Sequence, residues 1–177
     1  MVSANRILPG HRAPELQLGS NGERAFNLRQ SLKSVDNFLI LVFYRGYHSD
    51  LCRKHLSKLD KLHEKFEKNG IKVVGISMDS KEDAERSAEE WELKNVEIAY
   101  GLSFEIAKVW GLFLSSNRSS KGPERFNEPA VFVIQSDGLL YSAHIQSMPF
   151  GRPNPKKLLK RLKWCLKKEY PIRGGLE

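Results

Sequence analysis

Cysteine is scarce in this chain. Only Cys52 and Cys165 occur among its 177 residues, which excludes the framework of several disulfides that stabilises small secreted domains. The N-terminal residues contain no long apolar run, so the sequence predicts neither a signal peptide nor a membrane anchor. Both absences favour a cytoplasmic protein in a reducing compartment.

Two kinds of ligand-binding motif are also missing. The chain has no glycine-rich loop of the type that cradles a phosphate group. Its five histidines include no pair at the spacing of metal ligands, since His55 and His63 stand eight residues apart in one predicted helix. We therefore expect no cofactor and no bound metal ion.

Strand and helix patterns alternate along the chain, which predicts one α/β domain over residues 1–177 with a central mixed sheet flanked by helices. Residues 15–18 and 25–28, separated by a Gly-Ser-Asn-Gly turn at 19–22, predict an N-terminal hairpin. Further strands are predicted at 38–44, 71–78, 96–99, 131–134 and 139–145, and helices at 50–69, 80–93, 103–112 and from 155 or 156 onward. Residues 114–127 show no apolar period and are predicted to form a mobile loop.

Three of these helices carry more detailed predictions. Ser80 is expected to cap its helix, with Asp83 three residues further on as in a capping box. The helix at 50–69 is expected to bury one stripe, made of Leu51, His55, Leu59, Leu62 and Phe66. The last helix is expected to bury Leu158, Leu159, Leu162, Cys165 and Leu166.

Positive charge is concentrated near the C-terminus. The chain carries a formal charge of +8, and the segment from Arg152 to Arg173 holds nine basic residues against one acid, Glu169. These basic residues are Arg152, Lys156, Lys157, Lys160, Arg161, Lys163, Lys167, Lys168 and Arg173. The run is explained either by a solvated helix face or by a surface that attracts nucleic acid, an acidic partner or membrane headgroups.

The strongest local signal surrounds Cys52. Ser49 is a natural N-cap for the helix that follows, which places Cys52 in the first helical turn, where unpaired amides and the helix dipole favour a thiolate. Arg45, His48 and Arg53 lie close in sequence. Cys52 is therefore a candidate nucleophile, and the alternative is a small buried cysteine that packs under the helix.

Five motifs in order resemble a known family. They are P-G-H-R-A-P-E-L-Q-L, F-Y-R-G, G-I-S-M-D-S, P-A-V-F-V-I-Q-S-D-G and M-P-F-G-R-P. Together they resemble the peroxiredoxin-like branch of the thioredoxin fold, the alkyl hydroperoxide reductase and thiol-specific antioxidant family, over about residues 8–173. The resemblance implies a thioredoxin-like fold and the reduction of hydroperoxides by one peroxidatic cysteine.

The resemblance also implies roles for single residues. In the family motif P-x-x-x-T/S-x-x-C, Cys52 takes the peroxidatic position, Ser49 the hydroxyl position that orients the peroxide, and Arg45 the position of the proline. Arg152 resembles a second family arginine near the active site. Pro129 stands where family members usually carry an arginine, and it resembles the cis-proline that thioredoxins place beside their active site.

Regeneration of the cysteine follows from the same resemblance. Cys165 is a candidate resolving cysteine, although its place on an apolar stripe favours a core residue. A one-cysteine mechanism then needs an external thiol such as thioredoxin, glutaredoxin or glutathione. Members of the family often form homodimers.

Two other functions stay open. The chain reads Ser49 where a dithiol reductase has the first cysteine of Cys-x-x-Cys, and serine cannot attack a disulfide. The remaining alternative is a thioredoxin-fold module that has lost catalysis and binds a partner through its basic C-terminal helix.

Overall fold

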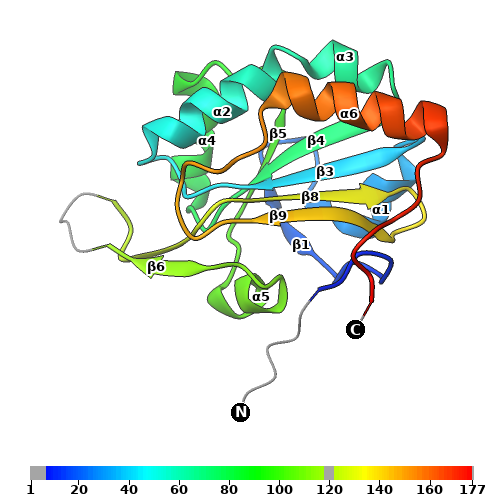
Figure 1. Ribbon diagram of the computed structural model, residues 1–177. Coiled ribbons are helices and arrows are strands. Elements are labelled where there is room, and N and C mark those ends of the chain that lie inside the picture. The colour runs from blue at the N-terminus through cyan, green and yellow to red at the C-terminus, as the bar shows by residue number, and fades with distance from the viewer. Residues whose placement is uncertain (1–6, 118–121, 177) are drawn as a thin grey trace.

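A computed structural model describes residues 7–117 and 122–176. Its centre is a seven-stranded mixed sheet with the order β2-β1-β5-β4-β3-β8-β9 (Figure 1). The sheet strands are β1 (Gln17–Ser20), β2 (Phe26–Asn27), β3 (Phe38–Phe43), β4 (Ile71–Ile76), β5 (Glu97–Tyr100), β8 (Ala130–Gln135) and β9 (Leu140–Ile145). Strand β3 pairs in parallel with β4 and antiparallel with β8, so the predicted mixed sheet is confirmed.

Helices cover both faces of this sheet. They are α1 (Leu28–Lys33), α2 (Asp50–Asp60), α3 (His63–Glu67), α4 (Lys81–Glu90), α5 (Phe104–Val109) and α6 (Pro155–Lys168). Residues of α2, α3, α4 and α6 share one core cluster, whereas residues of α1 and α5 share the cluster on the opposite face. Figure 1 shows α2, α3 and α6 side by side above the sheet.

The buried strand β3 supplies both clusters. All six of its residues are buried, and alternate side chains point to opposite faces, so that Ile40 and Val42 join the first cluster and Leu39 and Leu41 the second. This explains why residues 38–44 form a continuous apolar run in the sequence. The C-terminal end of β3 leads directly into the loop before α2, and that loop carries the candidate site.

Several local predictions are confirmed with small shifts of boundary. Strands β1 and β2 form the N-terminal hairpin, and β8 and β9 form the second hairpin with an irregularity at Val133 and Ile134. The Ser80 hydroxyl accepts a hydrogen bond from the Asp83 N–H and caps α4. In α6, Leu158, Leu159 and Leu162 are buried, whereas Cys165 and Leu166 are only partly buried.

The predicted helix at 50–69 is two helices. The α-helical hydrogen-bond pattern is interrupted at Leu62, whose N–H donates to the carbonyl of Leu59 three residues back, as in a 3₁₀ turn. α3 begins at the next residue. The predicted buried stripe was also wrong at its start, because Leu51 is 42% exposed while Cys52 and Leu56 are fully buried. The Ser49 cap sets this rotation, since it places Cys52 on the face of α2 that packs against the sheet.

The predicted loop at 114–127 contains two short strands. β6 (Leu114–Ser116) and β7 (Arg125–Asn127) pair antiparallel, although most of their side chains are polar and give no period. Residues 118–121, in the middle of this segment, lie outside the described residues. In the part of the chain that the structure describes, no helix is long and apolar enough to span a membrane.

Candidate active site

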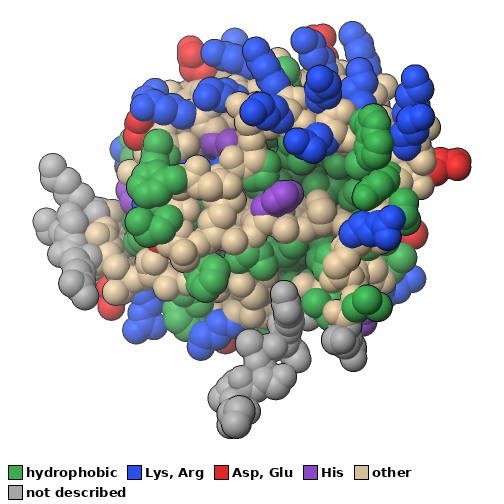
Figure 2. Space-filling model, viewed as in Figure 1, with side chains coloured by type: hydrophobic (Ala, Val, Ile, Leu, Met, Phe, Trp, Pro, Cys, Tyr) green, Lys and Arg blue, Asp and Glu red, His purple; other side chains and the backbone are tan. Residues whose placement is uncertain are grey.

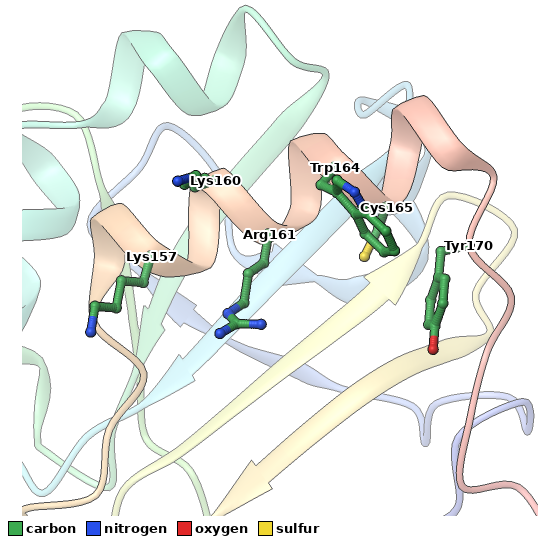
Figure 3. Close-up of a pocket in the computed structure, with 6 residues that line it drawn as sticks. All are labelled: Lys157, Lys160, Arg161, Trp164, Cys165 and Tyr170. Carbon is green, nitrogen blue, oxygen red and sulfur yellow. The ribbon is translucent and has the colours of Figure 1, made fainter.

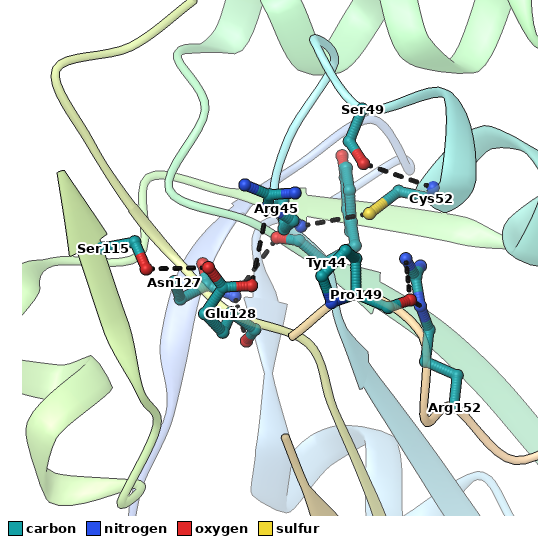
Figure 4. Close-up of polar contacts among 9 residues, drawn as sticks. All are labelled: Tyr44, Arg45, Ser49, Cys52, Ser115, Asn127, Glu128, Pro149 and Arg152. Atoms are coloured by element: carbon teal, nitrogen blue, oxygen red, sulfur yellow. Dashed lines mark hydrogen bonds and ion pairs between the residues drawn. The ribbon is translucent and has the colours of Figure 1, made fainter. Parts of the chain in front are cut away.

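Cys52 occupies the first turn of α2. Ser49 has an extended backbone and its hydroxyl accepts a hydrogen bond from the Cys52 N–H at 3.4 Å, which confirms the predicted N-cap (Figure 4). The Ser49 N–H bonds in turn to the Gly46 carbonyl at 3.1 Å. The turn at 46–49 therefore fixes where the helix begins and where the cysteine lies.

The sulfur of Cys52 has a polar partner but no contact with solvent. The backbone N–H of Arg45 donates to Cys52 Sγ at 3.3 Å, and the residue is 0% exposed. A hydrogen bond of this kind is strongest when the acceptor carries negative charge. The sulfur therefore has one hydrogen-bond donor from the loop, and that donor is the backbone of Arg45 rather than its side chain.

The guanidinium of Arg45 turns toward a carboxylate that the sequence did not single out. Its Nε lies 3.6 Å from Oε2 of Glu128, and its Cζ lies 4.5 Å from the centre of the Phe126 ring. Glu128 is only 5% exposed, and its other oxygen accepts a hydrogen bond from the Ser115 hydroxyl at 2.7 Å. Arg45 and Glu128 therefore form a largely buried ion pair beside the cysteine loop (Figure 4).

Pro129 lies beside this loop, as predicted, but its geometry differs from the expectation. Ala130 pairs with Phe43, which places the preceding Pro129 next to Tyr44. The peptide bond before Pro129 is trans, so the resemblance to a cis-proline was wrong. Asn127 holds the two segments together, because its side-chain amide donates to the carbonyl of Tyr44 at 3.2 Å.

Arg152 reaches the same region from the segment before α6. Its Nε and Nη2 donate to the Pro149 carbonyl at 3.2 and 3.1 Å, and its Nη1 has no hydrogen-bond partner among the described residues. Its charge acts on His55, which lies one turn after Cys52. Burial first, and the Arg152 charge in addition, lower the pKa of His55 to about 4, so the imidazole is neutral at physiological pH.

A buried carboxylate supports the cysteine loop from behind. Asp79 Oδ2 accepts a hydrogen bond from the Tyr47 N–H at 2.9 Å, and burial raises the pKa of Asp79 to about 6. Gly46, at φ 122°, passes so close to Asp79 that a β-carbon there would collide with Oδ1. The sequence signals for this residue were its place directly after a buried strand and its membership of the motif G-I-S-M-D-S.

Tyr44 and His48 complete the surroundings of the loop. Tyr44 is fully buried in the same core cluster as Cys52, and burial raises the pKa of its hydroxyl far above the usual value. The His48 ring packs 5.1 Å from the Phe126 ring, and burial followed by the Arg45 charge lowers its pKa. His48 is therefore neutral and adds no positive charge to the site near pH 7.

Cys165 and Arg53 lie outside this group. Both cysteines are free thiols, and Cys165 faces Tyr141 and a pocket along α6. Arg53 turns to Asp50, with Nε 2.9 Å from Oδ1. Among the described residues, no three histidine, cysteine or acidic side chains are grouped as metal ligands would be.

Comparisons with known proteins identify the family of the chain and its fold. The family described as the AhpC/TSA family matches residues 9–143. A mutant of peroxiredoxin 6 from Arenicola marina is 18% identical with a TM-score of 0.74, and the match covers 92% of this chain and 74% of that one. Peroxidoxin BcpB from Mycobacterium tuberculosis is 19% identical with a TM-score of 0.72, covering 90% of this chain and 98% of that one.

A third solved structure gives the same result. A peroxiredoxin-like protein from Aquifex aeolicus is 18% identical with a TM-score of 0.69, and the match covers 88% of this chain and 86% of that one. No curated protein sequence matches the chain. At these identities the structural matches establish the fold, and they confirm the thioredoxin-like architecture that the five motifs predicted.

Proposed function

This chain belongs to the AhpC/TSA family, and from that premise we propose that it is a thiol-dependent peroxidase that reduces hydroperoxides through Cys52. The observation that carries the proposal is the placement of Cys52 Sγ in the first turn of α2, within 3.3 Å of the Arg45 N–H. A sulfur in that position is stabilised as an anion by the hydrogen bond and by the unpaired amides of the helix start.

The reaction oxidises the sulfur and reduces the peroxide. The Cys52 thiolate attacks one oxygen of the hydroperoxide, an S–O bond forms, and the O–O bond breaks. The leaving alkoxide takes a proton to become an alcohol, or water when the substrate is hydrogen peroxide. Cys52 is left as a sulfenic acid. An external thiol then displaces water to give a mixed disulfide, and a second thiol releases Cys52 as a thiol.

Ser49 and Arg152 are assigned supporting roles. The Ser49 oxygen already accepts from the Cys52 N–H, so its own proton is available to donate to the peroxide. Arg152 keeps an Nη1 without a partner among the described residues, which favours it as the cation that stabilises the leaving oxygen. Arg45 takes this role only when its guanidinium leaves Glu128.

Burial sets a condition on this chemistry. Cys52 is 0% exposed, so the segments that cover the sulfur must move before a peroxide can reach it. Segment 45–49 and the segment that carries Arg152 contribute contacts around the start of α2. We propose that local opening of one of these segments precedes attack.

The test is the rate of Cys52 oxidation by hydrogen peroxide, measured in a Cys165→Ser variant with trapping of the sulfenic acid. The proposal expects Cys52 to react faster than free glutathione at the same pH, and it expects turnover when thioredoxin, glutaredoxin or glutathione is added. Cys52→Ser should abolish turnover, whereas Cys165→Ser should retain it. Full turnover by Cys52→Ser, or oxidation of Cys52 no faster than that of glutathione, would contradict the assignment.

A second candidate is a binding module without catalytic activity. The specific observations that favour it are the complete burial of Cys52 and the pairing of Arg45 with Glu128. It expects Cys52 to stay unreactive toward peroxide and a partner to bind the basic face of α6 in a salt-dependent way. A dithiol reductase is disfavoured because Ser49 stands at the position of the attacking cysteine and serine cannot attack a disulfide. Normal rates of insulin reduction would overturn that view.

A further inference from the structure

A pocket lies along α6 and the segment that follows it, on the helical side of the sheet. It has a volume of about 720 Å³ and is lined by Lys157, Lys160, Arg161, Trp164, Cys165 and Tyr170 (Figure 3). None of the residues that carry the proposed peroxidase chemistry lines it. The volume falls within the range of about 300–1,000 Å³ that is typical of small-molecule sites.

The reversal of the chain after α6 builds the apolar wall of the pocket. Glu169 adopts a left-handed conformation with φ 47°, and the Tyr170 N–H returns to the Cys165 carbonyl at 2.9 Å. The Tyr141 hydroxyl donates to the Tyr170 carbonyl at 2.7 Å and ties this segment to β9. As a result the Trp164 and Tyr170 rings lie 5.2 Å apart, and both remain partly exposed at 50% and 40%.

Positive charge surrounds this aromatic pair. Lys157, Lys160 and Arg161 are exposed, Lys160 and Arg161 each follow Lys157 by about one turn of α6, and no acidic side chain lines the pocket. In Figure 2 the basic side chains crowd along the helical layer, and apolar atoms floor the hollow below them. The site therefore combines an apolar floor with a cationic rim.

We propose that this pocket binds a small organic anion with a flat apolar body. The carboxylate or phosphate of such a ligand pairs with Lys160 and Arg161, while its body stacks on Trp164 and Tyr170. A bilayer fits the surface less well, because Leu158, Leu159 and Leu162, the apolar face of α6, are buried in the core and cannot turn outward. The concave shape likewise favours a compact ligand over an extended polymer.

Binding at this pocket does not depend on the proposed peroxidase function. α6 runs away from the start of α2 in Figure 1, and the pocket is lined by residues of α6 and of the segment beyond it, with none from α2 or the loop before it. Cys52→Ser should therefore bind the ligand as tightly as the wild type. Failure of one proposal leaves the other standing.

The probe is 1-naphthoate, an aromatic carboxylate, and the matched control ligand is 1-naphthamide, which has the same ring and no charge. Calorimetry should show that the carboxylate binds at least about tenfold more tightly than the amide. The double variant Lys160→Gln/Arg161→Gln should lose about tenfold in affinity for 1-naphthoate. The double variant Lys167→Gln/Lys168→Gln removes the same charge from the same helix outside the pocket, and it should bind nearly as tightly as the wild type.

Two further measurements locate the ligand. Trp164→Ala should weaken binding about tenfold, whereas Trp164→Phe should retain most of it. In the Cys52→Ser protein, where Cys165 is the remaining thiol, 1-naphthoate should slow alkylation of Cys165 by iodoacetamide. Equal affinity for the amide, equal loss in the two double variants, or unprotected Cys165 would each overturn the proposal. The proposal would also be overturned if phosphatidylserine vesicles or single-stranded DNA displaced bound 1-naphthoate and bound the protein more tightly than 1-naphthoate does.

Discussion

Replacing Asp79 by Asn is expected to change how the stability of the protein depends on pH. Asp79 is 7% exposed, and burial raises its pKa from 3.8 to about 6. Between these values the folded protein keeps a proton that the unfolded chain has lost. Raising the pH through this window therefore favours the unfolded chain, and the stability associated with Asp79 is lost as the pH rises.

The size of the effect follows from the two pKa values. A rise from 3.8 to about 6 corresponds to a cost of about 3 kcal/mol for ionising Asp79 in the folded protein. Asn cannot ionise, but its side-chain oxygen can still accept the hydrogen bond from the Tyr47 N–H. The difference in unfolding free energy between Asp79→Asn and the wild type should therefore grow by about 3 kcal/mol in favour of the variant as the pH rises from about 3.5 to about 7. A constant difference caused by the substitution itself does not affect this change.

The assay is urea unfolding of both proteins at several pH values in this range. Asp137→Asn is the matched control, because Asp137 is exposed in the β8–β9 turn and pays no burial cost. His55→Gln provides a test of opposite sign. The pKa of His55 is lowered from 6.5 to about 4, so its contribution to stability is lost as the pH falls through that window. Parallel stability curves for the wild type and Asp79→Asn would refute the reasoning.

Three further substitutions test the packing and charges of the site region. Asp60→Ala removes an acceptor placed 2.8 Å from the N–H of both Asn95 and Val96, and urea unfolding should show a loss of about 3 kcal/mol; a loss under 1 kcal/mol would contradict this. Gly46 has φ 122°, and Gly46→Ala places a β-carbon against the carboxylate of Asp79. The unfolding free energy should fall by about 2 kcal/mol, whereas an unchanged value would count against backbone strain at this position. Glu128→Gln leaves the partly buried Arg45 side chain without its counter-charge, and hydrogen peroxide should oxidise Cys52 about fivefold faster; an unchanged or slower rate would show that the Glu128 charge does not oppose the reaction.

The strands and helix caps could be predicted because their signals are local. A strand buried on both faces needs an unbroken apolar run, which β3 and β4 provide. A serine before a helix offers its hydroxyl to the third residue, and both Ser49 and Ser80 do so. The position of Cys52 followed from one of these caps, so the centre of the candidate site was visible in the sequence.

What the sequence could not predict depends on contacts between distant segments. Strands β6 and β7 pair across residues 117–124, and only the pairing of their backbones makes them strands. In the sequence, nothing distinguishes Glu128 from the other acidic residues, of which the chain has 21 in all. In the fold, it lies between β7 and β8 and pairs with Arg45, which stands 83 positions earlier in the chain. The depth at which Asp79 is buried likewise comes from the loop that closes over it.

The ion pair explains how an arginine can stand in the loop beside the buried cysteine. The side chain of Arg45 is 25% exposed and that of Glu128 only 6%, so neither charge is well hydrated. An unpaired charge in such a place costs several kcal/mol, and Glu128 and the face of Phe126 offset that cost. The pairing also draws the guanidinium away from the sulfur. Arg45 then contacts Cys52 through its backbone N–H, and Arg152 is a second cation of this region, with an Nη1 that lacks a hydrogen-bond partner among the described residues.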